Sequence, residues 1–207
     1  MLEEVSCTMT IAGSDSGGGA GIEADLKTFA ALGVFGTCAI TAVTAQNTVG
    51  VYEVFPMSPS VVKSQIQAVL EDIEVKAVKI GMLYSREIAE IVSEAIRRYG
   101  LIAVLDPVFE AGTGEPLIKK GDLEAIIAQI VPWTLVLTPN IHEAEVISKM
   151  EIKNLEDMKQ ACKRISGLGP KTVVIKGGHL EGEKVYDLVY SQGTSRIFEK
   201  PRINVEA

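Results

Sequence analysis

The stretch TIAGSDSGGGAGIEADLK, residues 10–27, joins an apolar run to the start of a helix through a glycine-rich loop. Five glycines fall within residues 13–21, the glycine loop, which is more than a tight turn needs. At such a strand-to-helix junction, bare backbone N–H groups and the positive end of the helix dipole converge on one place. We therefore predict that the loop closely approaches a ligand, with a simple turn as the alternative.

The glycine loop does not match the common nucleotide-binding motifs. Gly13 and Gly18 have the spacing of a Walker A motif, but Gly19 stands where that motif has its lysine. No Gly-x-Gly-x-x-Gly occurs in the chain, so a Rossmann dehydrogenase is disfavoured.

Short β-branched runs alternate with amphipathic stretches along the chain. The expected strands are 5–12, 36–43, 51–55, 75–80, 101–105, 134–137 and 172–176, and the expected helices run from the glycine loop to residue 32 and over 58–73, 85–99, 122–130 and 154–166. This alternation predicts an α/β sandwich with helices on both faces of a mostly parallel sheet. Residues 184–190 and 195–199, separated by Gln192-Gly193, predict an antiparallel hairpin.

Composition narrows the class of protein. A length of 207 residues favours one domain over residues 1–207, and a net charge of -7 argues against a nucleic-acid partner. Three separated cysteines, Cys7, Cys38 and Cys162, indicate a reducing compartment with buried thiols. The acidic N-terminus is unlike a signal peptide, and the longest mostly apolar stretch, 34–45, is too short to cross a bilayer. We expect a soluble, cytoplasmic protein with no membrane partner.

Chemically informative residues follow six of the expected strands. They lie in segments 13–21, 44–47, 81–82, 106–108, 138–140 and 176–179. Because the C-terminal ends of parallel strands share one edge of a sheet, and ligands of open α/β sheets bind along that edge, we predict one site there.

Two of these residues suit a small heteroaromatic ring. Asp25 follows Gly21 by one helical turn, so it can face the same cleft, although an acid near a helix start also has a purely structural explanation. Gln46 offers a donor and an acceptor side by side, which matches a ring nitrogen next to an amine, unless it is a solvated loop residue. Met82 is either a wall of that pocket or ordinary core.

Four other residues suit phosphate and a hard cation. Asn140 and Glu143 have the spacing of a capping box, and their oxygens together with those of Asp106 also suit Mg²⁺. Lys176 ends a strand and precedes Gly177-Gly178, which leaves room for a phosphate chain near its ammonium group. We interpret neither His142 nor His179 as a metal ligand.

Five segments together carry a resemblance to a known family. They are residues 12–28, 41–48, 79–83, the Thr138-Pro139-Asn140 run with Glu143-Ala144, and 176–179. In these segments the chain resembles hydroxymethylpyrimidine/phosphomethylpyrimidine kinase of thiamine biosynthesis, a family of the ribokinase-like superfamily, and the resemblance extends in order along the whole chain.

The resemblance implies a three-layer α/β/α fold with ATP and Mg²⁺ as co-substrates. It also implies phosphorylation of 4-amino-5-hydroxymethyl-2-methylpyrimidine and then of its monophosphate, and the superfamily often forms homodimers. The positions that match the family's pyrimidine pocket are Gly13, Ala20, Asp25, Gln46, Met82 and Val108. Asp106 and Glu143 match its Mg²⁺ region, and Asn140 and Lys176 match its contacts to ATP phosphates.

The chain departs from the family pattern at its end. In the family, a segment like Arg202-Ile203-Asn204 is followed by a Gly-Thr-Gly-Cys loop, which forms an anion hole and carries the proposed catalytic base, whereas this sequence ends at Ala207. None of its cysteines takes that role, so we expect the 207 residues to be part of a longer kinase. Loss of one oxyanion-type donor costs roughly 10²- to 10³-fold in rate, so almost no turnover is expected of these residues alone.

Two other functions stay open. A pyridoxal kinase acts on a ring of similar size, and a catalytically silent pyrimidine-binding or regulatory module would keep the substrate side without the anion hole.

Overall fold

A computed structural model describes residues 5–112, 114–178 and 182–203. The chain forms two compact units, Met1–Trp133 and Thr134–Ala207, called unit 1 and unit 2 below. His179 and residues 204–207 lie outside the described residues, so nothing tests the interpretations that concern them. The single domain over residues 1–207 stays a prediction.

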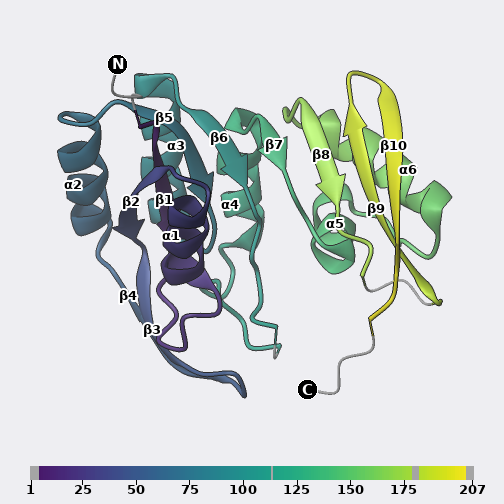
Figure 1. Cartoon of the computed structure of the whole chain (residues 1–207), viewed down its shortest axis with the longest axis horizontal. Coiled ribbons are helices and arrows are strands. Elements are labelled where there is room, and N and C mark those ends of the chain that lie inside the picture. Colours follow the sequence, from purple (N-terminus) through teal and green to yellow (C-terminus); the bar gives the residue numbers. More distant parts are fainter. Residues whose placement is uncertain (1–4, 113, 179–181, 204–207) are drawn as a thin grey trace. The chain divides into compact units, whose positions relative to one another are not determined.

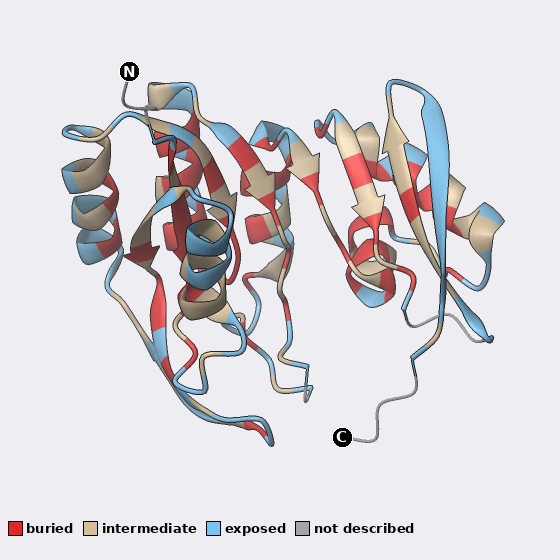
Figure 2. Cartoon of the chain, viewed as in Figure 1, coloured by how far each residue is buried: buried red, intermediate tan, exposed pale blue. Residues whose placement is uncertain are grey.

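Unit 1 is built on a parallel sheet in the order β6-β5-β1-β2. Its elements are β1 (Cys7–Ala12), α1 (Gly21–Ala31), β2 (Phe35–Ile40), β3 (Ala42–Gln46), β4 (Val51–Pro56), α2 (Pro59–Leu70), β5 (Val75–Ile80), α3 (Arg86–Tyr99), β6 (Ile102–Leu105), α4 (Leu123–Ile130) and a 3-10 turn (Val131–Trp133). Helix α1 packs against β1 and β2 on one face of this sheet, and α3 lies on the other, in contact with α2 and α4 (Figure 1). The buried residues gather on the strands and on the helix sides that face them (Figure 2).

Unit 2 holds a mixed sheet and two helices. Its elements are β7 (Val136–Leu137), α5 (Ile141–Ser148), α6 (Leu155–Ser166), β8 (Thr172–Ile175), β9 (Lys184–Ser191) and β10 (Thr194–Pro201). Strands β7 and β8 are parallel, whereas β8–β9 and β9–β10 are antiparallel. The predicted hairpin is confirmed, and both turn residues, Gln192 (φ 50°) and Gly193 (φ 80°), have the positive φ that a tight hairpin turn requires.

Helices α2 and α3 each begin directly after a serine that caps them. Ser58 and Ser85 accept hydrogen bonds from the N–H groups of the third residue beyond them, and Gly100 ends α3 in the left-handed conformation (φ 63°). Helix α2 ends at Leu70, three residues before the predicted end. Among the described residues, none of the helices combines the length and the apolar character needed to cross a membrane.

The single strand predicted over 36–43 is wrong. The N–H of Thr41 donates to the carbonyl of Ala12, its hydroxyl donates to the carbonyl of Met82 at 2.6 Å, and its own carbonyl accepts from Met57. These bonds interrupt the chain between β2 and β3. Strand β3 then pairs with β4 in a separate antiparallel ribbon, so 44–47 lies within that ribbon and not at the end of a parallel strand, and the expected strand 51–55 is antiparallel as well.

The cysteines are free, as their spacing predicts. Cys7 and Cys162 are buried, and Cys38 is half-buried. Burial raises the pKa of the Cys162 thiol to about 12, although a hydrogen bond with the backbone of Ile175 opposes the shift. Cys162 is therefore an unreactive thiol of the core at neutral pH.

Candidate functional site

One cavity in unit 1 collects the residues that the sequence assigns to a small-molecule pocket. It has a volume of about 270 Å³ and is bordered by the glycine loop, α1, β3 and the ends of β5 and β6. Its lining includes all six predicted pyrimidine-pocket residues, Gly13, Ala20, Asp25, Gln46, Met82 and Val108, together with Asp106. The structure thus brings these seven residues together, and their roles in binding stay predictions.

Two glycines at the base of the loop have close neighbours, but only Gly21 is required by the approach of backbone. Gly21 has a φ of +57°, and a Cβ there would lie 2.5 Å from the carbonyl oxygen of Gly13. A Cβ on Gly13 would lie 2.8 Å from the sulfur of Met82. A larger residue at Gly21 would therefore displace the loop backbone, whereas one at Gly13 would need a shift of the Met82 side chain.

The backbone N–H groups of the glycine loop are occupied by an acid of the chain itself. The buried Asp15 accepts hydrogen bonds from the N–H groups of Gly17 (2.8 Å), Gly19 (2.9 Å) and Ala20 (2.8 Å) through its carboxylate. Its backbone carbonyl accepts from Gly18 at 2.9 Å. The prediction that bare N–H groups hold a ligand is therefore wrong for residues 17–20.

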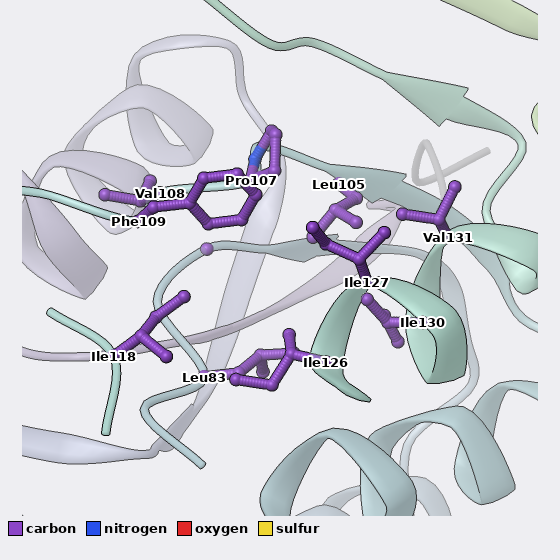
Figure 3. A pocket seen from close by; sticks show the side chains of 11 residues that line it. Leu83, Leu105, Pro107, Val108, Phe109, Ile118, Ile126, Ile127, Ile130 and Val131 are labelled. Carbon is purple, nitrogen blue, oxygen red and sulfur yellow. The ribbon is translucent and has the colours of Figure 1, made fainter. Parts of the chain in front are cut away.

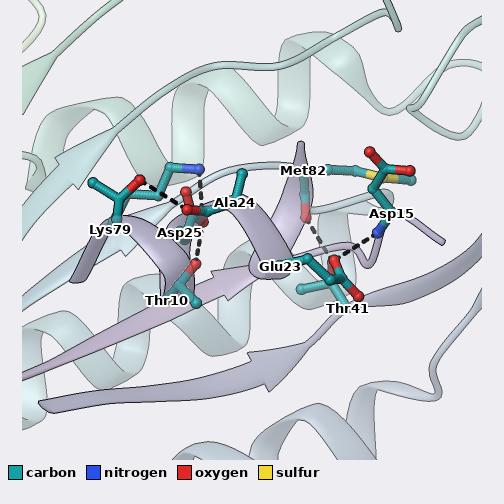
Figure 4. A network of polar contacts seen from close by, with 9 residues as sticks. Thr10, Asp15, Glu23, Ala24, Asp25, Thr41, Lys79 and Met82 are labelled. Atoms are coloured by element: carbon teal, nitrogen blue, oxygen red, sulfur yellow. Dashed lines mark hydrogen bonds and ion pairs between the residues drawn. The ribbon is translucent and has the colours of Figure 1, made fainter. Parts of the chain in front are cut away.

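The same hydrogen bonds favour the ionised form of the Asp15 carboxyl. Burial raises the pKa of the Asp15 carboxyl, but the N–H groups of the loop outweigh it and lower the pKa below its ordinary value. The N–H of Asp15 in turn donates to Oε2 of Glu23 at 2.7 Å, which ties the loop to the first turn of α1 (Figure 4).

Asp25 belongs to a charged cluster that lies beside the loop. Its Oδ2 accepts hydrogen bonds from the hydroxyl of Thr10 (2.6 Å) and from Nζ of Lys79 (2.9 Å), and Figure 4 shows the three side chains converging from β1, α1 and β5. The side chains of Lys79 and Asp25 are 26% and 15% exposed, so the pair is largely shielded from solvent. Both residues line the cavity and give its wall a cation next to a carboxylate.

Gln46 is held by the ribbon and by the glycine loop together. Its N–H donates to Oγ of Ser16 at 2.8 Å, and its backbone carbonyl accepts from the same hydroxyl at 2.7 Å. The hydroxyl of Thr44 lies 3.4 Å from the amide oxygen Oε1. The side-chain amide is half-buried at the cavity, where a ligand could use it as donor and acceptor.

In unit 2, Asn140 and Glu143 form the predicted capping box. Oδ1 of Asn140 accepts from the N–H of Glu143 at 2.9 Å, and Oε2 of Glu143 accepts from the N–H of Asn140 at 2.7 Å. The structural interpretation of this pair is confirmed. Because carboxylate and amide oxygens accept more than one bond, the capping role leaves the Mg²⁺ and phosphate interpretation as a prediction.

Lys176 lies beside Asn140 in unit 2. The two residues form a parallel bridge, and the N–H of Lys176 donates to the carbonyl of Pro139 at 2.9 Å. A Cβ on Gly177 would lie 1.9 Å from the carbonyl oxygen of Tyr186, so this glycine is required by its contact with β9. Gly178 has open space around its Cα. Only the second glycine therefore fits the expected role of leaving room for a phosphate chain.

A second cavity in unit 1 has a volume of about 10 Å³ and does not suit a ligand. It lies between α4 and the ends of β5 and β6, and its labelled lining residues are all apolar (Figure 3). A cavity of this size holds at most one water molecule, and an apolar lining gives that water no partners. It is a packing defect of the core.

Asp15, Glu23, Thr10 and Lys79 organise the site, and the predictions assigned roles to none of them. A weak signal existed for Lys79, a lysine at the fifth position of the otherwise mostly apolar β5. In residues 5–112, 114–178 and 182–203, no group of three or more His, Cys, Asp or Glu side chains is arranged to hold a metal ion.

Comparison with known proteins agrees with this architecture. Residues 15–207 match the family model described as phosphomethylpyrimidine kinase. A hydroxymethylpyrimidine/phosphomethylpyrimidine kinase of Aquifex aeolicus (strain VF5) is 43% identical over 196 residues, which cover 94% of this chain and 77% of that protein.

Solved structures give the same result. The crystal structure of a phosphomethylpyrimidine kinase from Clostridium difficile 630 is 46% identical with a TM-score of 0.87, covering 93% of this chain and 84% of that one. Pyridoxal kinase of Staphylococcus aureus, in complex with AMP-PCP and pyridoxal, is 33% identical with a TM-score of 0.87, covering 98% and 74%. The predicted fold is confirmed: this is a ribokinase-like small-molecule kinase fold. The chain belongs to the phosphomethylpyrimidine kinase family.

Proposed function

We propose that the protein transfers phosphate from ATP to 4-amino-5-hydroxymethyl-2-methylpyrimidine and then to its monophosphate, in thiamine biosynthesis. The observation that carries this proposal is the cavity of unit 1, where the six predicted pocket residues meet in a protein of this family. Its volume of about 270 Å³ suits a single substituted ring, and Gln46 and Asp25 supply polar groups at its wall.

The phosphate donor and the metal ion are assigned to other residues. Lys176 and Asn140 would contact ATP phosphates, and Asp106 in unit 1 and Glu143 in unit 2 are each proposed as a carboxylate of the Mg²⁺ region. Mg²⁺ commonly binds one or two carboxylates plus substrate phosphates, so a single carboxylate with phosphate oxygens is sufficient without a protein cage of several ligands. When bound, the ion would neutralise charge on the phosphates.

The experiment supplies the protein, as its gene encodes it, with ATP, Mg²⁺ and the hydroxymethylpyrimidine. The expected result is the monophosphate followed by the diphosphate, detected by mass spectrometry. Absence of both products in a folded protein would overturn the proposal.

Pyridoxal kinase activity is the second candidate, because pyridoxal kinases share the fold at a TM-score of 0.87. Initial rates on the two substrates separate the candidates. We expect the larger kcat/KM for the hydroxymethylpyrimidine, and a larger value for pyridoxal would favour the alternative.

We also propose that the protein acts as a homodimer in the cytoplasm. The β3–β4 ribbon presents the cross-strand pair Val43 and Phe55 on its outer face, 44% and 68% exposed, while Thr44 on its inner face is buried. Exposed apolar side chains on a ribbon mark a surface suited to a second copy. Sedimentation of the wild type and of Phe55→Ser tests this, since the wild type should sediment as a dimer and the variant should dissociate more readily.

A further inference from the structure

The glycine loop satisfies most of its hydrogen-bond donors from within the chain. Seven of the ten backbone N–H groups of residues 13–22 donate to other atoms of unit 1. They belong to Ser14, Asp15, Gly17, Gly18, Gly19, Ala20 and Ile22. Four consecutive donors, residues 17–20, converge on Asp15 alone.

Asp15 occupies the position where a bound anion would otherwise lie. A helix N-terminus preceded by glycines attracts phosphate because N–H groups and the helix dipole point at it. Here Ala20, the capping residue of α1, has no side chain that can cap, and the Asp15 carboxylate accepts its N–H at 2.8 Å. Glu23 adds a second negative charge to the same turn.

We infer that Asp15 is a built-in anion that shapes the glycine loop as a wall of the cavity and keeps phosphate groups off the backbone N–H donors of residues 17–20. Asp15 lines the cavity together with Gly13, Ser14, Ala20 and Gly21, and because its carboxylate is taken up by the N–H groups of the loop, we assign it a positioning role. The role of Asp15 in shaping the wall for the pyrimidine rests on the proposed function, whereas its role as the anion bound by the loop does not.

Two physical consequences follow. A dianionic phosphate that approached the loop would meet an ionised carboxylate at 2.8–2.9 Å from the very donors it needs, so the loop repels it. Without Asp15 those donors would lack a partner, and the loop would relax. Displacements of about 1 Å in such a wall cost on the order of 10²-fold in activity.

The first arm of the test is chemical rescue of Asp15→Ala, read as thermal stability without any substrate. The variant removes a carboxylate that formate can replace, and its Tm should fall by about 3–10 °C. Formate should raise the Tm of Asp15→Ala more than that of the wild type, whereas formamide, its neutral isostere, should not. Equal effects of formate and formamide would overturn the built-in anion.

The matched control is Asp157→Ala. Asp157 also accepts a hydrogen bond from a backbone N–H, that of Lys153 at 3.0 Å, but this bond is exposed to solvent in the first turn of α6 in unit 2. Its loss should produce no preferential response to formate and no change in KM for the pyrimidine. A formate response equal to that of Asp15→Ala would show that the rescue is unspecific and would overturn the inference.

The second arm measures kinetics with the hydroxymethylpyrimidine. Asp15→Ala should raise KM for the pyrimidine by about 10- to 100-fold with a smaller change in kcat, and formate should restore KM. An unchanged KM would overturn the positioning role. If the wild type turns over no pyrimidine while formate still stabilises Asp15→Ala, the proposed function fails and the built-in anion stands.

If Asp15→Ala does not fold, Asp15→Asn tests the inference in its place. The amide keeps the shape but replaces one acceptor oxygen by a donor, so the variant should be less stable than the wild type and should not respond to formate. Wild-type stability and wild-type KM in Asp15→Asn would contradict the inference.

Discussion

The N-termini of α1 and α5 solve the same problem in different ways. At α5, Asn140 and Glu143 cap the helix with side chains from its own first turn. At α1, the capping residue is Ala20, and the acceptor is Asp15, five residues upstream across the glycine loop. The first device is local and pairs the neutral amide of Asn140 with the carboxylate of Glu143, whereas the second reaches across five residues and uses the carboxylate of Asp15.

Because of this difference, the two helix N-termini offer different groups to a ligand. The charged acceptor fills the donors of the glycine loop and leaves that loop as a wall beside Asp25 and Gln46. At α5 the Glu143 carboxylate accepts the N–H of Asn140, and Lys176 lies beside Asn140 and brings a cation to this region. The comparison therefore favours phosphates in the region of Asn140 and Lys176, and a pyrimidine beside the glycine loop.

The largest expected effect is on the free energy of unfolding, and it concerns Gly177, which follows β8 near Asn140 and Lys176. Gly177→Ala should lower the free energy of unfolding by at least about 3 kcal/mol, because a Cβ there would lie 1.9 Å from a carbonyl oxygen of β9. Gly178→Ala is the matched control, with open space around it, and should change stability by about 0.5 kcal/mol or less. Urea denaturation of both variants measures the difference. Similar losses in the two would show that the approach to β9 is not what requires Gly177.

The next effect tests the cation beside the glycine loop. Lys79→Met should cost about 1.5–3 kcal/mol of stability, because it leaves the shielded Asp25 carboxylate with Thr10 as its remaining side-chain donor. Adding Asp25→Asn should recover part of this loss, since the uncompensated charge is removed.

The exposed pair of Lys153 and Glu151 provides the control. Both side chains are more than two-thirds exposed, so Lys153→Met should produce no measurable change in the denaturation midpoint. A loss equal to that of Lys79→Met would indicate that the charge of Lys79 is solvated and contributes little.

A smaller effect distinguishes the two caps by their pH dependence. The pKa of Asp15 is lower in the folded protein than its ordinary value, so its ionised form stabilises the fold above about pH 4, and this contribution is lost as the pH falls through the folded pKa. Asp15→Asn should therefore cost about 1–3 kcal/mol at neutral pH, and the gap to the wild type should close in acid.

Asn140→Ala should cost about 1 kcal/mol at every pH, because the amide it removes does not titrate in this range. Denaturation curves between pH 7 and 3 check both variants. A gap for Asp15→Asn that does not depend on pH would contradict the charged cap.

The sequence predicts what depends on neighbouring residues. The capping box at Asn140 and the hairpin at Gln192-Gly193 are both set by residues within a few positions of each other, and both are confirmed. The division of 36–43 at Thr41 was missed, because it depends on carbonyl groups of Ala12 and Met82 that are distant in sequence.

The residues of the site show the same limit, because contacts between residues distant in sequence could not be predicted. Glycines and polar residues after β1, β5 and β6 predicted most of the lining of the cavity, since parallel strands bring their ends together, whereas Gln46 reaches it from the antiparallel ribbon. The pairing of Asp25 with Lys79, 54 residues apart, could not be predicted from either neighbourhood. The role of Asp15 as acceptor for the N–H groups of residues 17–20 was missed, although Asp15 lies in the segment 10–27. The sequence shows where Asp15 is but not which backbone donors point toward it.

The central claim is that the glycine loop serves the pyrimidine while Asn140 and Lys176 serve phosphate. Calorimetric titration of Gln46→Ala and Lys176→Met, each with the hydroxymethylpyrimidine and with ATP, tests it most directly in the protein as its gene encodes it. We predict a crossed pattern, in which Gln46→Ala loses about 10- to 100-fold in pyrimidine affinity and keeps ATP affinity, and Lys176→Met does the reverse. Loss of ATP affinity in Gln46→Ala with pyrimidine affinity unchanged would contradict the account.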